Sequence, residues 1–276
     1  MTTSGGRGIR SVGVCLCIWL LLAAGGAPDL WAVTLRINQP RIEAAVTPGE
    51  LLRGTIEVEN LVEEPVEITV YLQDWRYVAP GDGTKEFAPA STLPQSCADW
   101  VSFFPQRLQL PPKGHEAVNY TIRVPDDARD AAYAVLFFET LLGEGPSEEG
   151  GVSVLYTARL GSLILLEIKG SAQRAATITD LTITPPDDHQ PLQIRGQLTN
   201  TGNVAVGAVG EFHVVDAEGR IVARGTVPAR YTHPGLSVPL DVTWVGSLAS
   251  GTYRVVLTLD LGGDQVLVEE RTFAIP

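Results

Sequence analysis

The feature that most constrains the fold of this chain is the near absence of helical periodicity in its sequence. Runs of about five to eight residues rich in Val, Ile, Thr, Leu and Tyr recur instead, separated by Pro, Gly, Asp and Asn. Short strands with regular turn signals between them are typical of antiparallel β-sandwiches. The expected strands include GTIEVEN, VEITVYLQDW, AVNYTIRV, AAYAVLFFE, VSVLYTARL, GEFHVVD, YRVVLTLDL and VLVEERTFAI.

One such pattern occurs twice. The stretch RGQLTNTGNVAVG, at 195–207, predicts two extended segments joined by a turn, because Asn and Gly tolerate left-handed backbone angles. A shift of 140 residue numbers lays 56–72 over 196–212, with Asn60 on Asn200 and Leu72 on Phe212. The repeat predicts that each half of the chain folds on the same plan.

The second part of each copy also corresponds. A Pro/Gly loop leads to a strand, a polar turn and a strand that begins near a tyrosine, Tyr133 in the first copy and Tyr253 in the second. A tyrosine at this place pins the preceding loop with its hydroxyl while its ring enters the core. The fold class expected is therefore all-β, with two immunoglobulin-like β-sandwiches in tandem.

The domain limits follow from composition. We expect a signal peptide at 1–32, a first sandwich at 33–170 and a second at 176–276, with a short polar joint between them. The Gly- and Glu-rich segment 142–151 is expected to link two late strands of the first sandwich, and 79–89 and 184–191 are expected to be exposed loops.

The amino-terminal segment has the pattern of an export signal. Arg7 and Arg10 precede an apolar run at 12–27, which is shorter than the roughly 20 residues that span a bilayer as a helix. Cleavage after Ala32 or near Gly26 fits the small residues there, and an uncleaved anchor is the alternative. No later segment has the length of a membrane span, so the mature protein is expected in the periplasm, secreted or at the cell surface.

Charge and cysteine content narrow the possible partners. The formal net charge is −12 at pH 7, which argues against nucleic acid or anionic lipid, because both require clustered positive charge. After removal of 1–32 only Cys97 remains, so no intramolecular disulfide is expected. A buried, idle thiol is the simpler interpretation of Cys97 than a nucleophile.

Signals of catalysis are scarce, and we expect no enzyme, no cofactor and no metal site. The four histidines are scattered without metal-ligand spacing. The stretch PPDDH, at 185–189, invites a metal-assisted hydrolase around Asp187, Asp188 and His189, although an acidic turn explains it more simply. Five Trp and Tyr residues fit either a sugar-stacking surface or core packing: Tyr71, Trp75, Tyr77, Trp100 and Trp244.

Binding through a strand edge is the remaining possibility. In GGVSVLYTARLGSLILLEI, at 150–168, Val152, Val154 and Tyr156 alternate outward from a glycine-rich segment. An exposed strand offers free backbone donors and acceptors to another chain, and its apolar side chains can fill a groove in a partner. The alternative is that this strand only completes its own sheet.

The first half of the chain, about 34–168, resembles the amino-terminal domain of the PapD-like periplasmic chaperones that help assemble pili. The resemblance lies in PRIEAAVTPGELLRGTIEVENLVEEPVEITVYLQDW, at 40–75, and WVSFFPQRLQLPPKGHEAVNYTIRV, at 100–124, with the two strands that follow. The second half resembles instead the fibronectin-like or adhesion-type β-modules of bacterial surface proteins.

The resemblance implies a mechanism in which an Arg and a Lys hold the terminal carboxylate of a subunit while an alternating strand fills the subunit's groove. Arg41 falls on the cleft Arg, whereas the cleft Lys falls on Gly161 with Arg159 nearby. The donated apolar positions fall on Val152, Val154 and Tyr156.

The function expected is therefore that of an exported, non-enzymatic chaperone-like or accessory protein for surface-fibre assembly, which binds a pilin-like subunit by strand donation. The expected partner-binding residues are Arg41, Val152, Val154, Tyr156 and Arg159. The alternative is a structural or adhesive envelope module that binds protein or glycan.

Overall fold

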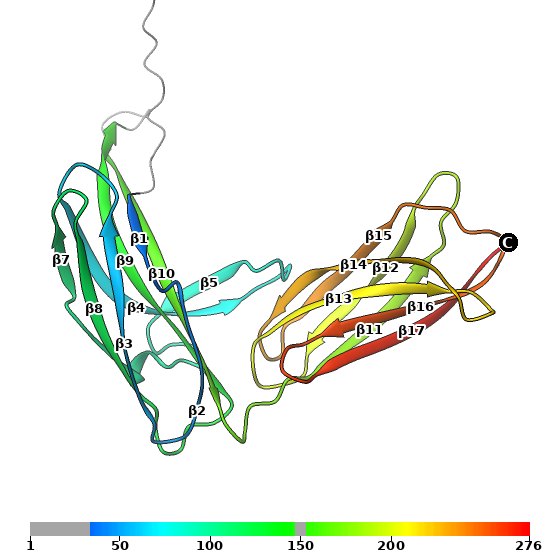
Figure 1. Cartoon of the computed structure of the whole chain (residues 1–276), viewed down its shortest axis with the longest axis horizontal. Helices are drawn as coiled ribbons and strands as arrows, with labels where there is room; N and C mark the ends of the chain where they lie inside the picture. The colour runs from blue at the N-terminus through cyan, green and yellow to red at the C-terminus, as the bar shows by residue number, and fades with distance from the viewer. Residues whose placement is uncertain (1–33, 147–152) are drawn as a thin grey trace, which may run out of the picture. The chain divides into compact units, whose positions relative to one another are not determined.

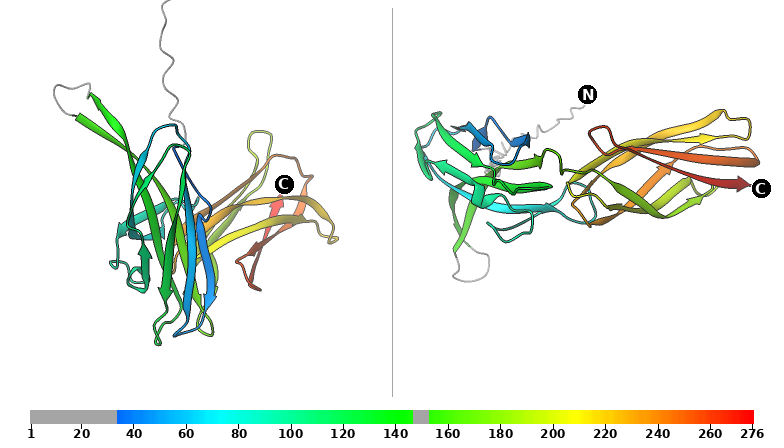
Figure 2. Two further views of the ribbon diagram at one scale, coloured as in Figure 1. Left: turned by 60° about the vertical axis from the view of Figure 1, so that its left-hand side comes forward. Right: turned by 90° about the horizontal axis from the view of Figure 1, so that it is seen from below.

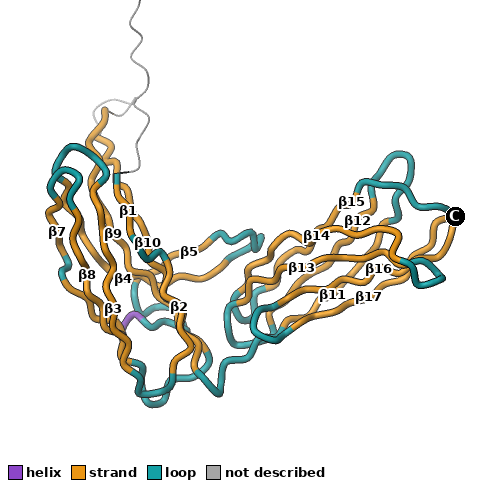
Figure 3. Tube along the Cα trace, viewed as in Figure 1, coloured by secondary structure: helices purple, strands orange, loops and turns teal. Residues whose placement is uncertain are grey.

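The computed structural model describes residues 34–146 and 153–276. The expected signal peptide at 1–32 and the expected donor residue Val152 lie outside the described residues. The described chain is built almost wholly of β-strands, with one short 3-10 turn at Ala98–Trp100 (Figure 1, Figure 3). In the part of the chain that is described, no helix has the length and apolar character needed to cross a membrane.

The first sandwich contains two sheets. The smaller has the order β1-β3-β8-β6, and the larger has the order β2-β10-β9-β4-β5, with β7 also paired to β4. The strands of the smaller sheet are β1 (Leu35–Ile37), β3 (Leu51–Asn60), β6 (Val101–Phe104) and β8 (His115–Arg123). Those of the larger are β2 (Arg41–Val46), β4 (Val66–Tyr77), β5 (Lys85–Pro89), β7 (Arg107–Leu110), β9 (Ala131–Pro146) and β10 (Ser153–Ile168).

The second sandwich also contains two sheets, and with the first it forms one compact unit, Val33–Pro276. Its sheets have the orders β11-β12-β15 and β14-β13-β16-β17. The strands are β11 (Ala176–Thr184), β12 (Leu192–Asn200), β13 (Val206–Val215), β14 (Ile221–Thr232), β15 (Ser237–Trp244), β16 (Gly251–Asp260) and β17 (Val266–Ile275). The expected all-β architecture of two tandem sandwiches is confirmed.

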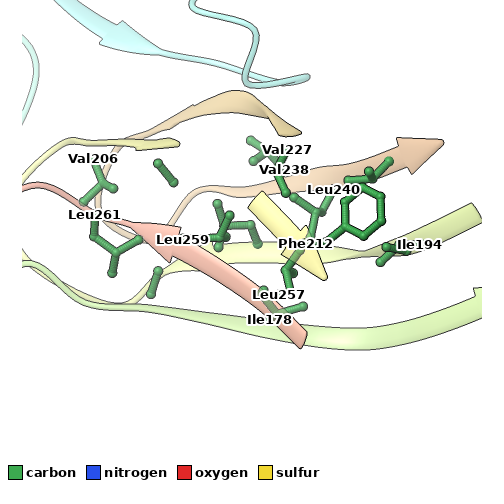
Figure 4. Close-up of a cluster of buried hydrophobic side chains, with 14 of the residues drawn as sticks. Ile178, Ile194, Val206, Phe212, Val227, Val238, Leu240, Leu257, Leu259 and Leu261 are labelled. Atoms are coloured by element: carbon green, nitrogen blue, oxygen red, sulfur yellow. The ribbon is translucent and has the colours of Figure 1, made fainter. Parts of the chain in front are cut away.

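Strict alternation explains most of these strands. In β3, Ile56, Val58 and Asn60 are buried, while the residues between them face outward. In the second sandwich, Phe212 of β13 points into the core beside Ile194 of β12 and Leu240 of β15 (Figure 4). Each sheet thus presents one apolar face to its partner sheet, and the two sandwiches are stabilised by burial of these faces.

Strand β9 departs from alternation, because all its residues from Ala131 to Phe138 are buried. One face of β9 packs into the first core through Leu136 and Phe138, and the other joins a second cluster through Tyr133 and Phe137. That second cluster continues into the core of the second sandwich. A continuous apolar run is the sequence pattern of a strand that is covered on both faces.

The internal repeat predicted from the sequence is confirmed in matching contacts. Asn60 Nδ2 donates to Glu64 O at 2.7 Å, and Val62 N donates to Asn60 Oδ1 at 3.0 Å. Asn200 Nδ2 donates to Val204 O at 2.9 Å, and Gly202 N donates to its Oδ1 at 3.0 Å. Both asparagines are buried, so each serves as the polar core of an equivalent turn.

The expectation for the two tyrosines is confirmed in one copy and wrong in the other. Tyr253 donates its hydroxyl to Ala249 O at 2.8 Å and so pins the turn before β16. The Tyr133 hydroxyl instead accepts the N–H of Ala205, in the second sandwich, at 2.6 Å. The reason is that Tyr133 lies on the outer face of β9, away from the loop that precedes it.

Two of the three expected loops also differ from expectation. Residues 79–89 contain β5, and their tip packs on the second sandwich, because Tyr231 N donates to Gly81 O at 2.8 Å. The segment 142–151 does link β9 to β10, but 142–146 belong to β9 itself. The turn at 184–191 is exposed around Asp187, as expected.

Candidate partner-binding edge

The candidate site is an arm formed by the distal parts of β9 and β10. The two strands pair antiparallel from Ala131 with Glu167 to Pro146 with Ser153. The register shifts between Tyr156 and Thr157, where β9 carries the extra residue Leu142. This hairpin runs beyond the ends of the neighbouring strands (Figure 2).

The edge of β10 that faces away from β9 is closed only near the body of the sheet. Strand β2 pairs in parallel with 163–168, and Ser162 Oγ donates to Gln39 O at 2.7 Å. Among residues 34–146 and 153–276, no strand pairs with this edge at 153–161. Of the stretch singled out in the sequence, residues 153–161 are therefore paired with β9 on one side, and no described strand pairs with them on the other.

The backbone groups on the open edge follow from alternation. Leu163 donates its N–H to Pro40 O at 3.0 Å, away from β9. Because alternate residues of a strand direct their N–H and C=O the same way, Gly161, Arg159 and Thr157 present theirs to the open edge. This is a row of donors and acceptors about 13 Å long, measured from Thr157 to Gly161 at about 3.3 Å per residue.

Apolar side chains accompany this edge. Leu155 is 59% exposed and Tyr156 is 41% exposed, and Leu141 of β9 is 57% exposed. Val154 lies in β10 opposite Gly145. Tyr156 and Arg159 are three residues apart, so they lie on opposite faces of the strand.

Arg159 is held on the outer face of the larger sheet. Its guanidinium carbon lies 4.5 Å from the ring centre of Phe137 and 5.3 Å from that of Phe87. The Tyr71 hydroxyl, on which the charge of Arg159 acts, donates to Glu139 Oε2 at 2.6 Å. Burial, and then this bond to Glu139, raise the pKa of Tyr71. The aromatic base fixes the guanidinium beside the open edge of β10.

Arg41 lies on the same face but in a different setting. It is opposite Leu163 in the register of β2 and β10, and its guanidinium is 3.3 Å from Glu43 Oε1. Leu163 and Arg159 are four positions apart in β10, which corresponds to about 13 Å. The structure therefore places Arg41 and Arg159 on one face without joining them in a two-cation site.

Gly161 has a local reason to be glycine. A Cβ at this position would lie 2.9 Å from Val135 Cγ2 and 3.0 Å from Phe137 Cε1. Phe137 is directly opposite Gly161 across the β9–β10 pair. The aromatic ring thus takes the space above Gly161 that a longer side chain would need.

The aromatic residues that suggested a sugar-binding surface are mostly packed. Trp75 is 1% exposed and donates its indole N–H to Ala134 O at 2.9 Å. Tyr77 is also buried, and the partly buried Trp100 and Trp244 pack against the first and second clusters. A stacking surface that uses Trp75 or Tyr77 is excluded.

The residues weighed for catalysis have structural contacts. Asp187 Oδ1 accepts the N–H of His189 at 2.7 Å and of Gln190 at 2.9 Å, and these bonds lower the pKa of Asp187. Within the described ranges, no group of three His, Cys, Asp or Glu residues is arranged to hold a metal ion. Cys97 is fully buried, and burial followed by the charge of Asp74 raises the pKa of its thiol.

Two interactions that matter in this region were not predicted from the sequence. The stacking of Arg159 on Phe87 depends on β5, whose sequence predicts an exposed loop. The contact of His233 with Tyr77 joins residues 156 positions apart. Neither has a local sequence signal, because both depend on the pairing of distant strands.

No protein-family model matches this chain, and no curated protein matches it. Among solved structures, the class 5 fimbriae chaperone CfaA is similar at 15% identity and a TM-score of 0.44, over 88% of this chain and 99% of that chain. The complex of the SafA pilin with the SafB chaperone from Salmonella enterica gives 11% identity and a TM-score of 0.42, over 90% and 99%. The YadV chaperone gives 11% and 0.41, over 87% and 100%.

Each of these structures contains a protein named as a chaperone, and CfaA is named as a chaperone of fimbriae. At such identities and TM-scores the similarity assigns no activity to this chain. The chain is thus similar to fimbrial chaperones over most of its length, with two tandem immunoglobulin-like β-sandwiches.

Proposed function

We propose that this protein is an exported, chaperone-like accessory factor that binds a subunit of a surface fibre through the open edge of β10. One observation carries the proposal: among the described strands, only β9 pairs with β10 along 157–161. A strand of the partner would pair with this edge and bury the exposed side chains of the arm.

Physical considerations favour this role for the arm. A two-stranded hairpin is marginally stable alone in water, and proteins usually protect the edges of long strands. Here Leu141 and Leu155 are more than half exposed on the arm. Pairing with a partner would satisfy the free backbone groups and remove these leucines from water, which is favourable by about 25 cal/mol per Å² of apolar surface.

The anchoring of the partner would differ from the mechanism that the sequence resemblance implies. Phe137 covers Gly161, Arg41 is ion-paired with Glu43, and the cation on which the charge of Arg41 acts is Lys85 of β5 rather than Arg159. The loss of one charge-assisted contact corresponds to about 1.5–3 kcal/mol of binding free energy. We therefore assign most of the affinity to main-chain pairing and to the apolar residues of β10, with Val154 and the preceding Val152 as proposed contributors and Arg159 beside them.

The replacement of Thr157 by proline tests the proposal. Its N–H faces the open edge, so proline removes a donor that a partner would use and leaves the pairing with β9 in place. We expect binding to a fibre subunit to weaken at least about tenfold, because one lost hydrogen bond and imperfect pairing cost about 1.4 kcal/mol or more. The measurement is a titration with a purified exported fibre subunit.

The matched control is Thr157→Val, which keeps the N–H and the β-branched shape and should bind like the native chain. Equal affinity of Thr157→Pro and the native chain for that subunit would rule out pairing at this edge. Retention of both variants on purified cell wall, without subunit binding, would indicate the adhesive module instead.

A further inference from the structure

His233 follows the last residue of β14 and reaches from the second sandwich onto the outer face of the first. It is 9% exposed, and its Nδ1 accepts the backbone N–H of Tyr77 at 3.0 Å. Three aromatic rings surround it, with centres 4.6 Å away for Tyr133, 5.3 Å for Trp75 and 5.5 Å for Tyr77. The imidazole therefore joins the two sandwiches inside an aromatic cage.

The hydrogen-bond pattern requires the neutral ring. Because Nδ1 accepts from Tyr77 N, the single ring proton resides on Nε2. Nε2 is buried and has no hydrogen-bond partner in the described structure. A second proton would occupy Nδ1 and face the N–H of Tyr77, so two donors would oppose each other and a charge would lie buried without a counter-ion.

The charged groups around the aromatic cage would not compensate the positive charge of a protonated His233. From β4, Arg76 is 2.6 Å from Glu86 of β5, and Asp74 is already engaged by the loop at 91–96. Lys85 of β5 lies 5.2 Å from the centre of the Tyr77 ring. Burial raises the pKa of Tyr77, and the charge of Arg41 on β2 opposes that rise.

The other ionisable groups in contact are phenols. From β9, the Tyr133 hydroxyl accepts the N–H of Ala205, and from β14 the Tyr231 ring lies 5.2 Å from that of Tyr77. Burial, and then the charge of Arg76, lower the pKa of His233 to about 4.

The rest of this contact region consists of neutral hydrogen bonds, the carboxylate of Asp130, and the ion pairs of Glu167 with Arg174 and of Glu43 with Arg41. Tyr231 N donates to Gly81 O at 2.8 Å, and Gln95 Nε2 donates to Asn203 O at 2.9 Å. Asn203 also donates to Asp130 Oδ1 at 2.7 Å. His233 is thus the histidine whose protonation would act directly on the join between the sandwiches.

We propose that His233 is a proton-sensitive latch, which holds the two sandwiches together when its ring is neutral and releases them when the ring is protonated. This goes beyond strand donation and does not depend on it. It would allow acidification to change the position of the second sandwich while the two cores stay folded.

The direction in which pH changes the stability of the closed form follows from proton linkage. A histidine whose pKa is lower in the closed form contributes fully to closure above about pH 6.5, and this contribution is lost as the pH falls toward 4. With a pKa near 6.5 in the open form and about 4 in the closed form, the open-to-closed ratio rises about 30-fold from pH 7.5 to pH 5.

The test compares the chain from Val33 onward with His233→Gln and with His189→Gln. Glutamine at 233 offers an amide oxygen to Tyr77 N but does not titrate, and His189 is an exposed histidine in the same sandwich. Exchange of the Tyr77 amide hydrogen, corrected for the intrinsic effect of pH, is measured from pH 7.5 to 4.5 together with the radius of gyration.

We expect protection of Tyr77 to fall with acidification in the native chain and in His189→Gln, and to stay constant in His233→Gln. An identical pH profile in the native chain and in His233→Gln would overturn the proposal. So would an NMR titration that gives His233 in the native chain an ordinary pKa near 6.5, a result that does not require the variant to fold.

Discussion

Replacement of Asp74 by alanine is expected to lower the free energy of unfolding of the first sandwich by about 4 kcal/mol. The carboxylate is 1% exposed, on β4, under the loop that precedes β6. It accepts the N–H groups of Thr92 and Leu93, each at 2.8 Å, and of Ser91 at 3.2 Å. Ser96 Oγ donates to it at 2.6 Å.

The size of the effect follows from the number of donors left without an acceptor. A hydrogen bond to a charged group contributes about 1.5–3 kcal/mol, and alanine would remove these partly buried bonds together. The same loop carries Gln95 and Cys97, whose backbone groups bond to Tyr133 on β9. Loss of Asp74 would therefore also loosen the outer face of β9.

Urea denaturation followed by tryptophan fluorescence provides the measurement. Asp99→Ala is the matched control, because Asp99 accepts a bond from Ser91 in the same loop but is exposed. We expect less than about 1 kcal/mol from the control. A loss below about 1 kcal/mol for Asp74→Ala would show that the loop finds other acceptors.

The strands and the internal repeat could be predicted because their causes are local. Alternation in β3 and β13 sets which side chains enter the core, and Asn60 and Asn200 bond within their own turns. Such patterns need no knowledge of distant contacts. The tandem-sandwich architecture follows from them directly.

The contacts between the sandwiches could not be predicted, because they join residues far apart in sequence. Tyr133 has the sequence position of Tyr253, yet its hydroxyl bonds to Ala205. Residues 79–89 have the composition of a loop, but strand β4 extends far enough for β5 to pair with it. Tertiary contacts decide both cases over local propensity.

The candidate edge of β10 could be predicted only in part from the sequence. Alternation around Tyr156 predicts a strand, but it cannot distinguish an edge strand from a central one. The open edge at 153–161 follows from β2, which begins to pair with β10 only at Leu163. The arginines were both expected at the partner site, but their separate surroundings depend on the register of β2 and on the stacking of Arg159 on Phe87.

One packing arrangement recurs in both sandwiches and at the arm: a glycine lies opposite an aromatic residue on the neighbouring strand. The register pairs Gly54 with Tyr120 in the first sandwich and Gly225 with Phe212 in the second. Gly161 with Phe137 repeats the arrangement at the root of the arm. In each pair the aromatic side chain covers the glycine, so the ring and the missing side chain are specified together.

This pairing makes the second large effect predictable. Phe212 is 1% exposed among the side chains of the second core, and Phe212→Ala is expected to cost about 3–5 kcal/mol. A Cβ at Gly225 would lie 2.6 Å from Phe212 Cε1 and 2.9 Å from its Cζ. Gly225→Ala alone should therefore cost about 1–3 kcal/mol, because the buried ring has no room to move.

The double variant Phe212→Leu with Gly225→Ala distinguishes this explanation from a general weakness of β14. Leucine lacks the ring atoms that meet the new Cβ, so the two changes together should be more stable than the sum of the single effects by at least about 1 kcal/mol. Gly251→Ala is the matched control, because the nearest atom to its Cβ would be 3.6 Å away, an ordinary contact. Urea denaturation of the four variants gives the coupling, and strict additivity of Phe212→Leu and Gly225→Ala would refute the steric pairing of Gly225 with Phe212. A positive coupling would mean that Gly225 is glycine because of the ring beside it, and the same reasoning would then apply to Gly161 under Phe137.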